Sequence, residues 1–477
     1  MTEPADHRNW LIRGAAAILT GERGAPARYD VRALGGDIRV VHGRIAAIGR
    51  LDPTPGEAII DAQDCVVYPG WVNTHHHLFQ SLLKGIPAGI DLPLTDWLAT
   101  IPVPYRRYFD HEHALRVAAR VGLVELLLSG CTTVADHQYH YYPDMPYDAS
   151  AAVFDEAAAL GMRFVLCRGG QTRARTFGKP APREAAPETL DSFLAGVERD
   201  VKRFHDPAPD AMRRVVSAIT TPPWSAAPEE LTVLAREARR LGIRLHSHLS
   251  ETYDYVRFCR EVHGCSPIEF VERHEWVGPD VWFAHMVHLD AAEIQRCAET
   301  GTGIAHCPQS NARLGSGIAP VPQMLAAGVP VSLAVDGAAS NEAADMLSEA
   351  HACWLLHRAR PGHNDNGLGG QSNAISVEDV VHIGTAGGAR VLGLDAIGTV
   401  AVGQAADLAV YRLDHPRFMG LHDAAIGPVA SGGPPQLRAL LVHGKRVVQD
   451  DQIPGIDLNA LRHDAQQLVQ YMCESPP

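Results

Sequence analysis

Short apolar runs alternate with longer amphipathic stretches through the middle of this chain, and this alternation constrains the fold more than any other feature. Eight runs have the length of strands: 66–73, 132–135, 163–167, 215–219, 244–248, 281–285, 303–306 and 329–335. Strands that alternate with helices form parallel sheets, because each crossover helix packs back onto the sheet. Eight such units fit a closed (β/α)8 barrel, the TIM-like α/β fold, better than an open sheet.

Helical periodicity is clearest over residues 229–241. Its apolar residues recur at intervals of three and four and predict one buried stripe: Leu231, Leu234, Ala235, Ala238 and Leu241. Pro228 stands near the start and Gly242 near the end, as expected for helix boundaries. Ser376 followed by Asp379 resembles a capping box and predicts the start of another helix.

Both ends of the chain are rich in short strand patterns separated by Gly, Asp and Pro. Runs of this kind occupy 10–12, 38–41, 45–48, 59–60 and 66–68, and they return at 408–411 and 437–448, where Gly444-Lys445 resembles a hairpin turn. Strand-rich ends around a helix-rich middle predict that both ends join in one small β-sandwich. The expected division is therefore 1–69 and 396–477 for the sandwich and tail, with the barrel at 70–395.

Composition excludes several classes of protein. Hydrophobic residues make up 46% and charged residues 20%, which is typical of a globular enzyme rather than a disordered chain. The net charge of −13 argues against nucleic acid as a partner, and no apolar run approaches the roughly 20 residues that span a bilayer. The first seven residues lack the pattern of a signal peptide, and the nine scattered cysteines suit reduced core thiols, so we expect a cytoplasmic protein.

Polar residues stand where the predicted strands end, which is the edge of a barrel that carries its active site. The first strand leads into His75, His76 and His77, and the alternation of a strand places the first and third on one face. Two imidazoles placed in this way can ligate one divalent metal. Alone, such a pair can equally cap or hydrogen-bond the backbone.

Three further strands end in residues of the same chemical kind. The fifth ends at His248 with Glu251 close behind, the sixth ends at His285, and the eighth ends at Asp336. Each of these can separately be a core histidine with satisfied hydrogen bonds or a helix cap. Together they place imidazoles and carboxylates at one end of four strands, which favours a metal centre.

These motifs, in this order, resemble the amidohydrolase superfamily. The matching pieces are Pro-Gly-Trp-Val-Asn-Thr-His-His-His at 69–77, His248-x-x-Glu251, His285, Val-Asp-Gly at 335–337 and the late segment 403–408. The resemblance covers nearly the whole chain. Within the superfamily, the motifs most resemble those of the metal-dependent deaminase branch. This branch includes guanine, cytosine and S-adenosylhomocysteine deaminases and the triazine hydrolases.

The resemblance implies one divalent metal per chain, Zn²⁺ ahead of Fe²⁺ or Mn²⁺. The implied ligands are His75, His77, His248 and Asp336. Segment 217–224 holds no lysine, whereas the binuclear branch of the superfamily bridges its metals with a modified lysine there, so a mononuclear site is implied. The resemblance also implies that Asp336 accepts a proton from water, that His285 holds this water and that Glu251 protonates the substrate ring and the leaving amine.

Longer matches over 75–85 and 334–346 resemble the isoxanthopterin-type deaminases, and 136–137 and 168–170 also resemble the 8-oxoguanine type. They imply a small heterocyclic amine as substrate, isoxanthopterin or pterin-6-carboxylate first. Gln80 is the candidate for reading the aminopyrimidine edge. Arg168 is the candidate for holding a ring carbonyl, unless it belongs to a structural ion pair.

Three alternatives stay open at this point. The first is an 8-oxoguanine or guanine deaminase, and the second is an s-triazine aminohydrolase or chlorohydrolase. The third, from a different class, is a non-catalytic scaffold of the same fold, which would have lost its metal ligands. The sequence also leaves open whether the chain forms a homo-oligomer.

Overall fold

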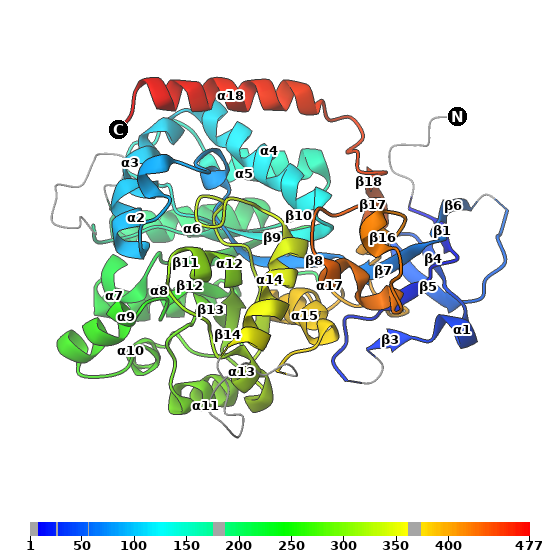
Figure 1. Ribbon diagram of the computed structural model, residues 1–477. Coiled ribbons are helices and arrows are strands. Elements are labelled where there is room, and N and C mark those ends of the chain that lie inside the picture. The colour runs from blue at the N-terminus through cyan, green and yellow to red at the C-terminus, as the bar shows by residue number, and fades with distance from the viewer. Residues whose placement is uncertain (1–7, 25–26, 56, 175–186, 361–373) are drawn as a thin grey trace.

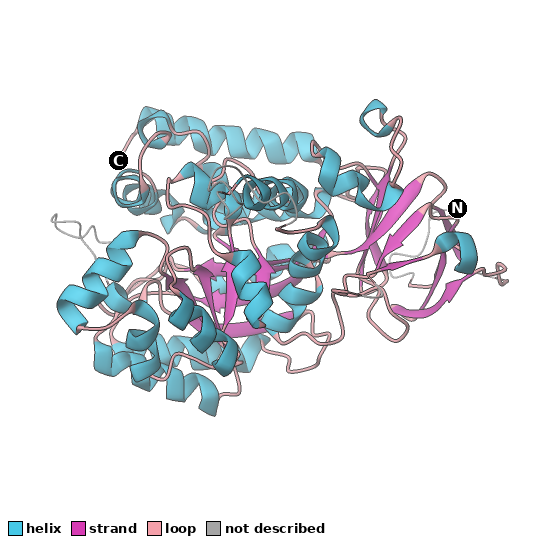
Figure 2. Cartoon of the chain, turned by 60° about the horizontal axis from the view of Figure 1, so that its bottom comes forward, coloured by secondary structure: helices cyan, strands magenta, loops and turns pink. Residues whose placement is uncertain are grey.

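The computed structural model describes residues 8–24, 27–55, 57–174, 187–360 and 374–477. The N-terminal residues 1–7, on which the expectation of a missing signal peptide rests, lie outside these ranges. Eight parallel strands form a barrel with helices between them, and a second group of strands lies beside it (Figures 1 and 2). The (β/α)8 fold predicted from the sequence is confirmed.

The barrel strands follow one another in chain order around the sheet. They are β8 (Trp71–His76), β9 (Cys131–Gln138), β10 (Arg163–Arg168), β11 (Arg213–Ala218), β12 (Leu245–Leu249), β13 (Val281–His285), β14 (Gly303–His306) and β15 (Val331–Leu333). First and last strand meet at a single parallel bridge between His76 and Asp336, where the amide of Asp336 donates to the carbonyl of His75 at 3.1 Å.

Helices cover the outside of the barrel. The longer ones are α4 (Glu112–Leu128), α5 (Ala149–Leu160), α6 (Leu190–Phe204), α8 (Pro228–Arg240), α11 (Ala291–Thr300), α14 (Met346–Ala359), α15 (Val377–Gly384) and α16 (Ala386–Leu392). In α8 the predicted stripe is buried apart from Leu241, which is half-buried just past the helix end. The Ser376–Asp379 capping box at the start of α15 is confirmed.

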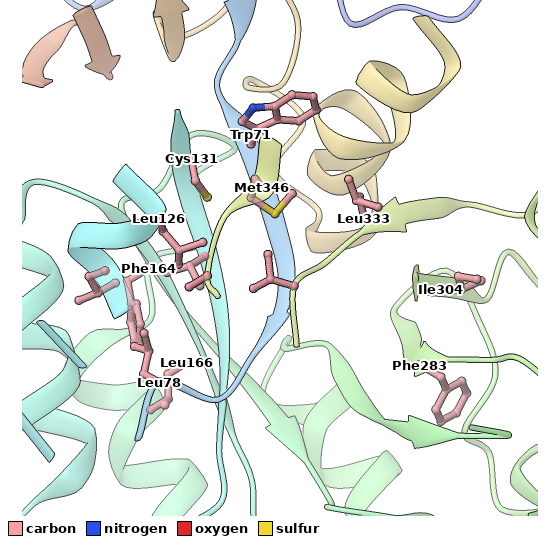
Figure 3. Close-up of a cluster of buried hydrophobic side chains, with 14 of the residues drawn as sticks. Trp71, Leu78, Leu126, Cys131, Phe164, Leu166, Phe283, Ile304, Leu333 and Met346 are labelled. Atoms are coloured by element: carbon pink, nitrogen blue, oxygen red, sulfur yellow. The ribbon is translucent and has the colours of Figure 1, made fainter. Parts of the chain in front are cut away.

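Side chains alternate between two cores along the barrel strands. Large residues such as Trp71, Phe164 and Leu333 face the helices and form one cluster with Met346 at the start of α14 (Figure 3). Their immediate neighbours on the strands are smaller and belong to a second cluster, which includes Val72, Val165 and Ala334. This period of two is the pattern of strands buried on both faces.

Two further sheets are built from the ends of the chain, blue and orange in Figure 1: one from N-terminal strands alone and one from strands of both ends. The four-stranded sheet contains β5 (Arg44–Gly49), β4 (Asp37–Val41), β1 (Trp10–Arg13) and β6 (Ala58–Asp61). The six-stranded sheet contains β18 (Lys445–Gln449), β17 (Leu437–Val442), β16 (Leu408–Arg412), β7 (Cys65–Pro69), β2 (Ala17–Leu19) and β3 (Arg28–Tyr29). Their inner faces share one apolar core, as in a β-sandwich.

The first expected strand, 66–73, divides between two sheets. Residues up to Pro69 pair with β16 in the six-stranded sheet, while Trp71 begins the barrel. The break falls at Gly70, where a Cβ atom would lie 2.3 Å from Cγ2 of Thr132, so only glycine fits. A continuous apolar run does not reveal such a change of sheet.

The last part of the expected sandwich and tail, 396–477, contains a long helix. This helix, α18 (Leu458–Glu474), lies across the barrel and packs on α4 (Figure 1). Within the described ranges, none of the helices combines the length and apolar character needed to cross a bilayer.

Candidate metal centre and active site

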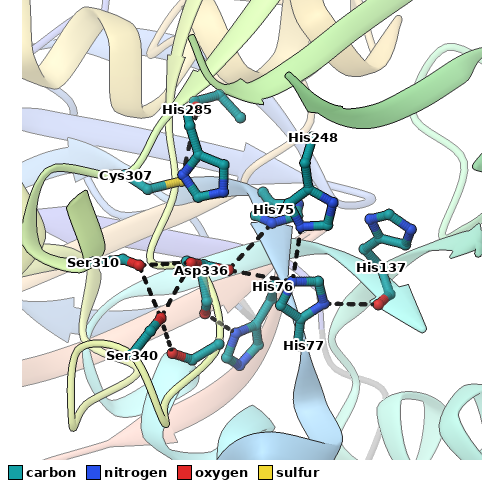
Figure 4. Close-up of polar contacts among 12 residues, drawn as sticks. His75, His76, His77, His137, His248, His285, Cys307, Ser310, Asp336 and Ser340 are labelled. Carbon is teal, nitrogen blue, oxygen red and sulfur yellow. Dashed lines mark hydrogen bonds and ion pairs between the residues drawn. The ribbon is translucent and has the colours of Figure 1, made fainter. Parts of the chain in front are cut away.

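Three histidines and one aspartate converge at the carboxyl end of the barrel strands. His75 and His77 come from β8 and its end, His248 from β12, and Asp336 from the loop after β15. One ligand atom from each lies within 4.8 Å of the others, and all four side chains are buried. Figure 4 shows His75, His77, His248 and Asp336 pointing toward one another.

Hydrogen bonds to backbone carbonyls settle which nitrogen of each ring carries the proton. Nδ1–H of His77 donates to the carbonyl of His137 at 2.8 Å, and Nδ1–H of His248 donates to that of Thr220 at 2.6 Å. A carbonyl can only accept, so Nε2 of each neutral ring is left with its lone pair. Burial lowers the pKa of His248 well below its usual value, which keeps that ring neutral.

His75 is oriented in the same way through a second histidine. Nδ1 of His246 donates to the carbonyl of Trp282 at 3.0 Å, so its Nε2 must accept from Nδ1–H of His75 at 2.8 Å. Burial lowers the pKa of His246 to about 3 and that of His75 well below its usual value. His75 Nε2 therefore also presents a lone pair, and it has no hydrogen-bond partner among the described residues.

These lone pairs face one another at distances that suit a metal ion. Nε2 of His77 lies 3.2 Å from Nε2 of His248, and Oδ1 of Asp336 lies 3.2 Å from Nε2 of His75 and 3.3 Å from Nε2 of His77. Without a cation this arrangement is repulsive. Four ligands at 2.0–2.1 Å from a tetrahedral zinc would stand about 3.3–3.4 Å apart, so the residues fit a divalent metal.

The other oxygen of Asp336 is held by two hydroxyl groups. Oδ2 accepts from Ser310 Oγ at 2.6 Å and from Ser340 Oγ at 3.1 Å (Figure 4). The backbone at Asp336 and at His285 lies in the left-handed region, with φ of 62° and 75°. Strain of this kind concentrates at functional sites, where the surroundings must hold the residue in place.

Glu251 and His285 lie in the same cavity as the metal-binding group. Oε2 of Glu251 is 3.7 Å from Nε2 of His285. Nδ1–H of His285 donates a hydrogen bond to Oδ1 of Asn311 at 2.9 Å, which orients the ring. The cavity is lined by His77, Gln80, Leu94, Trp97, Leu98, Pro102, Val103, Arg106, Tyr139, Gln171, Thr220, Thr221, Ser225, His248, Glu251, Tyr255, His285, Leu314 and Asp336. Three of the four candidate metal ligands, the Glu251–His285 pair and apolar walls thus line one cavity.

Gln80 lines this cavity, as predicted for a residue that reads the substrate edge. Its Nε2 donates to the hydroxyl of Tyr139 at 3.0 Å, and its Oε1 has no partner among the described residues. The amide packs on Gly337, where a Cβ atom would lie 2.0 Å from Oε1. A side chain at position 337 would therefore displace Gln80.

Arg168 stands at the end of β10 but is not among the described residues that line the cavity. Its guanidinium forms two hydrogen bonds with Glu188, at 2.6 and 2.8 Å, and stacks 3.9 Å over the ring of Tyr141. Burial lowers the pKa of Arg168, but Glu188, together with Tyr141 and Asp200, raises it above its usual value. These contacts match the structural ion pair that the sequence left open, and a substrate contact stays a prediction.

Sequence reasoning missed the contribution of His246. The signal was present, because His246 and His248 form a second His-x-His at the end of a strand. Another buried pair shows the contrast: Nε2 of His306 and of His357 lie 3.0 Å apart with Cys353 nearby. Within the described ranges, Nδ1 of His306 and Nδ1 of His357 have no hydrogen-bond partner. In a metal-ligating histidine, the ring N–H that faces away from the metal nearly always donates a hydrogen bond.

Comparison with known proteins assigns the family. The Amidohydrolase family matches residues 66–447, which include every residue of the site. The chain belongs to the amidohydrolase family. An isoxanthopterin deaminase from an unknown prokaryotic organism is 58% identical over 468 residues, 97% of each chain. An 8-oxoguanine deaminase of Pseudomonas aeruginosa is 38% identical over 466 residues, 96% of this chain and 98% of that one.

Two solved structures have a similar fold. An amidohydrolase from an environmental sample of the Sargasso Sea superposes with a TM-score of 0.84 at 53% identity, covering 98% of this chain and 99% of that one. The atrazine chlorohydrolase TrzN of Arthrobacter aurescens TC1, complexed with zinc, gives 0.86 at 27% identity over 96% and 99%. The chain is an enzyme, a hydrolase that acts on C–N bonds other than peptide bonds, as its relatives are named deaminases and hydrolases of this family.

Proposed function

We propose that this amidohydrolase is a zinc-dependent deaminase of an amino-substituted fused N-heterocycle, acting in the cytoplasm. Isoxanthopterin or pterin-6-carboxylate ranks first as substrate and 8-oxoguanine second, following the names and identities of the two relatives. The observation that carries the proposal is the convergence of three imidazole lone pairs and a carboxylate in the cavity that also holds Glu251.

In this proposal His75, His77, His248 and Asp336 hold one Zn²⁺. A zinc ion in such a site lowers the pKa of its water toward about 7, which makes water a nucleophile at neutral pH. The zinc in the TrzN structure and the match of the ligand spacing to zinc both favour this metal. Fe²⁺ or Mn²⁺ would serve the same ligand types.

The side chains of the cavity then divide the proton transfers. Asp336 accepts a proton from the attacking water, and His285 hydrogen-bonds the oxygen that adds to the amino-bearing carbon. Glu251 donates its own proton to the neighbouring ring nitrogen, then takes the remaining proton of the added hydroxyl and passes it to the amino group. The proton held by Asp336 returns to Glu251 and restores the starting state. The C–N bond breaks, ammonia leaves, and the carbon keeps the oxygen as a carbonyl.

Gln80 pairs with the pyrimidine edge of the ring in this arrangement. Its amide lies beside the metal-binding group and is held by Tyr139, so it is fixed before substrate arrives. A preformed amide of this kind orients a planar ring at low entropic cost.

The test is an ammonia-release screen over aminopteridines, aminopurines and aminotriazines, with zinc measured in the same preparation. We expect about one zinc per chain and the fastest release from a pteridine. The variants His75→Ala, His77→Ala, His248→Ala and Asp336→Ala should each lose most zinc or nearly all activity. Two of these variants with full zinc and full rate would refute the ligand set, and turnover of aminotriazines alone would refute the substrate class.

A further inference from the structure

A buried arginine without a carboxylate partner lines the cavity. Arg106 begins η3 (Arg106–Asp110), and its side chain is only 6% exposed. Among the described residues no carboxylate forms an ion pair with Arg106, and its Nε has no hydrogen-bond partner. A buried guanidinium is normally paired, because removing a charge from water is costly.

The surroundings of Arg106 compensate its charge only in part. Its guanidinium lies 4.5 Å over the ring of Tyr139, a cation–π contact that supplies no negative charge to neutralise the arginine. Burial lowers the pKa of Arg106, and of the neighbouring groups only Tyr139 opposes this. At Arg168, by contrast, the carboxylate of Glu188 makes the largest of the contributions that together outweigh burial.

Arg106 reaches the cavity from a different part of the chain than the candidate metal ligands do. The segment from α2 (Leu94–Thr100) through α3 (Pro102–Tyr105) to η3 contributes an apolar wall, with Trp97 and Val103, and Arg106 is its one charged member in the cavity lining. Glu251 and the metal-binding group come from the strand ends instead. Because both groups of side chains line one cavity, a flat ring bound there can contact Arg106 with one edge while its amino-bearing carbon faces Glu251.

We infer that Arg106 binds the oxygen-bearing edge of the substrate, a ring carbonyl or a carboxylate remote from the amino group. This inference rests on the proposed function and deepens it, because it assigns the selectivity for an oxygenated, anion-like edge to one residue of the cavity wall. Arginine suits this contact through its planar pair of donors.

The test compares two substrates that differ in one group, pterin-6-carboxylate and pterin. Arg106→Met should lower kcat/KM for pterin-6-carboxylate by about 30-fold or more, as truncation of a buried charge partner does, and at least tenfold less for pterin. Arg106→Lys keeps the charge and should recover part of the loss. Arg107→Met, the same change at the next, exposed position outside the cavity lining, is the matched control and should leave both rates unchanged.

Binding is measured separately through the fluorescence of pterin-6-carboxylate, and the thermal unfolding of each variant is recorded. Weaker binding by Arg106→Met at an unchanged melting temperature supports the inference. Equal losses on both substrates while the wild type remains a pteridine deaminase would overturn it and leave the proposed function standing. A wild type that releases ammonia from no pteridine or purine would overturn the proposed function itself.

Discussion

Replacing His246 by phenylalanine isolates the hydrogen bond that orients His75. Phenylalanine keeps the ring that stacks on Trp282, at 4.4 Å between centroids, but can neither accept from His75 nor donate to the Trp282 carbonyl. His75 is then free to turn its protonated nitrogen toward the metal site. Loss of such a supporting contact costs 10- to 100-fold in metal affinity, or about 1.4–2.8 kcal/mol.

The assay is a zinc titration against a chromophoric chelator at fixed pH, with thermal unfolding of the metal-free protein alongside. His246→Gln can place an amide oxygen near the lost acceptor and should recover most of the affinity. His357→Phe is the matched control, because it breaks another buried contact between two histidines, at 3.0 Å, outside the site. It should lower stability and leave zinc affinity unchanged. Wild-type affinity in His246→Phe would refute the reasoning, and equal losses in the Phe and Gln variants would assign the effect to packing.

Three further predictions address other parts of the chain. Glu251→Gln should keep its zinc and lose at least about 100-fold in rate; loss of the metal with the carboxylate would make Glu251 a ligand instead. Arg168→Met leaves Glu188 buried without its partner and should lower the free energy of unfolding by about 3–5 kcal/mol, and a selective loss on oxygenated substrates at unchanged stability would restore its predicted substrate contact. Arg163→Met should lower the free energy of unfolding by a similar amount, because it leaves the buried Asp407 without its ion pair between the barrel and the segment before β16. An unchanged free energy of unfolding in urea would contradict this.

Much of the fold follows from local patterns. The stripe of α8 and the capping box of α15 depend on residues within one helix, so the sequence contains the whole signal. The ends of the barrel strands were equally visible, because polar residues interrupt apolar runs there. His75, His77, His248 and Asp336 could therefore be proposed as a group before their distances were known.

What the sequence did not reveal depends on long-range contacts. Arg168 and Arg106 are both arginines near the predicted site, and only the folded chain shows that Glu188 neutralises the first while the second lines the cavity. The division of 66–73 between two sheets is likewise decided by β16, more than 300 residues away in the chain. The expected boundaries at 69 and 396 stay predictions, which separate unfolding of the two parts would test.

The bridge between His76 and Asp336 has a consequence for how the molecule responds to metal. Two strands whose residues are 260 positions apart meet there, and the ligands His75 and His77 stand on one side of this seam with Asp336 on the other. A metal ion with ligands on both sides of this seam would link β8 to the loop after β15. Removal of the metal by a chelator should therefore accelerate amide hydrogen exchange first along β8 and β15. Loss of the ion would then open the barrel at this seam and also abolish catalysis.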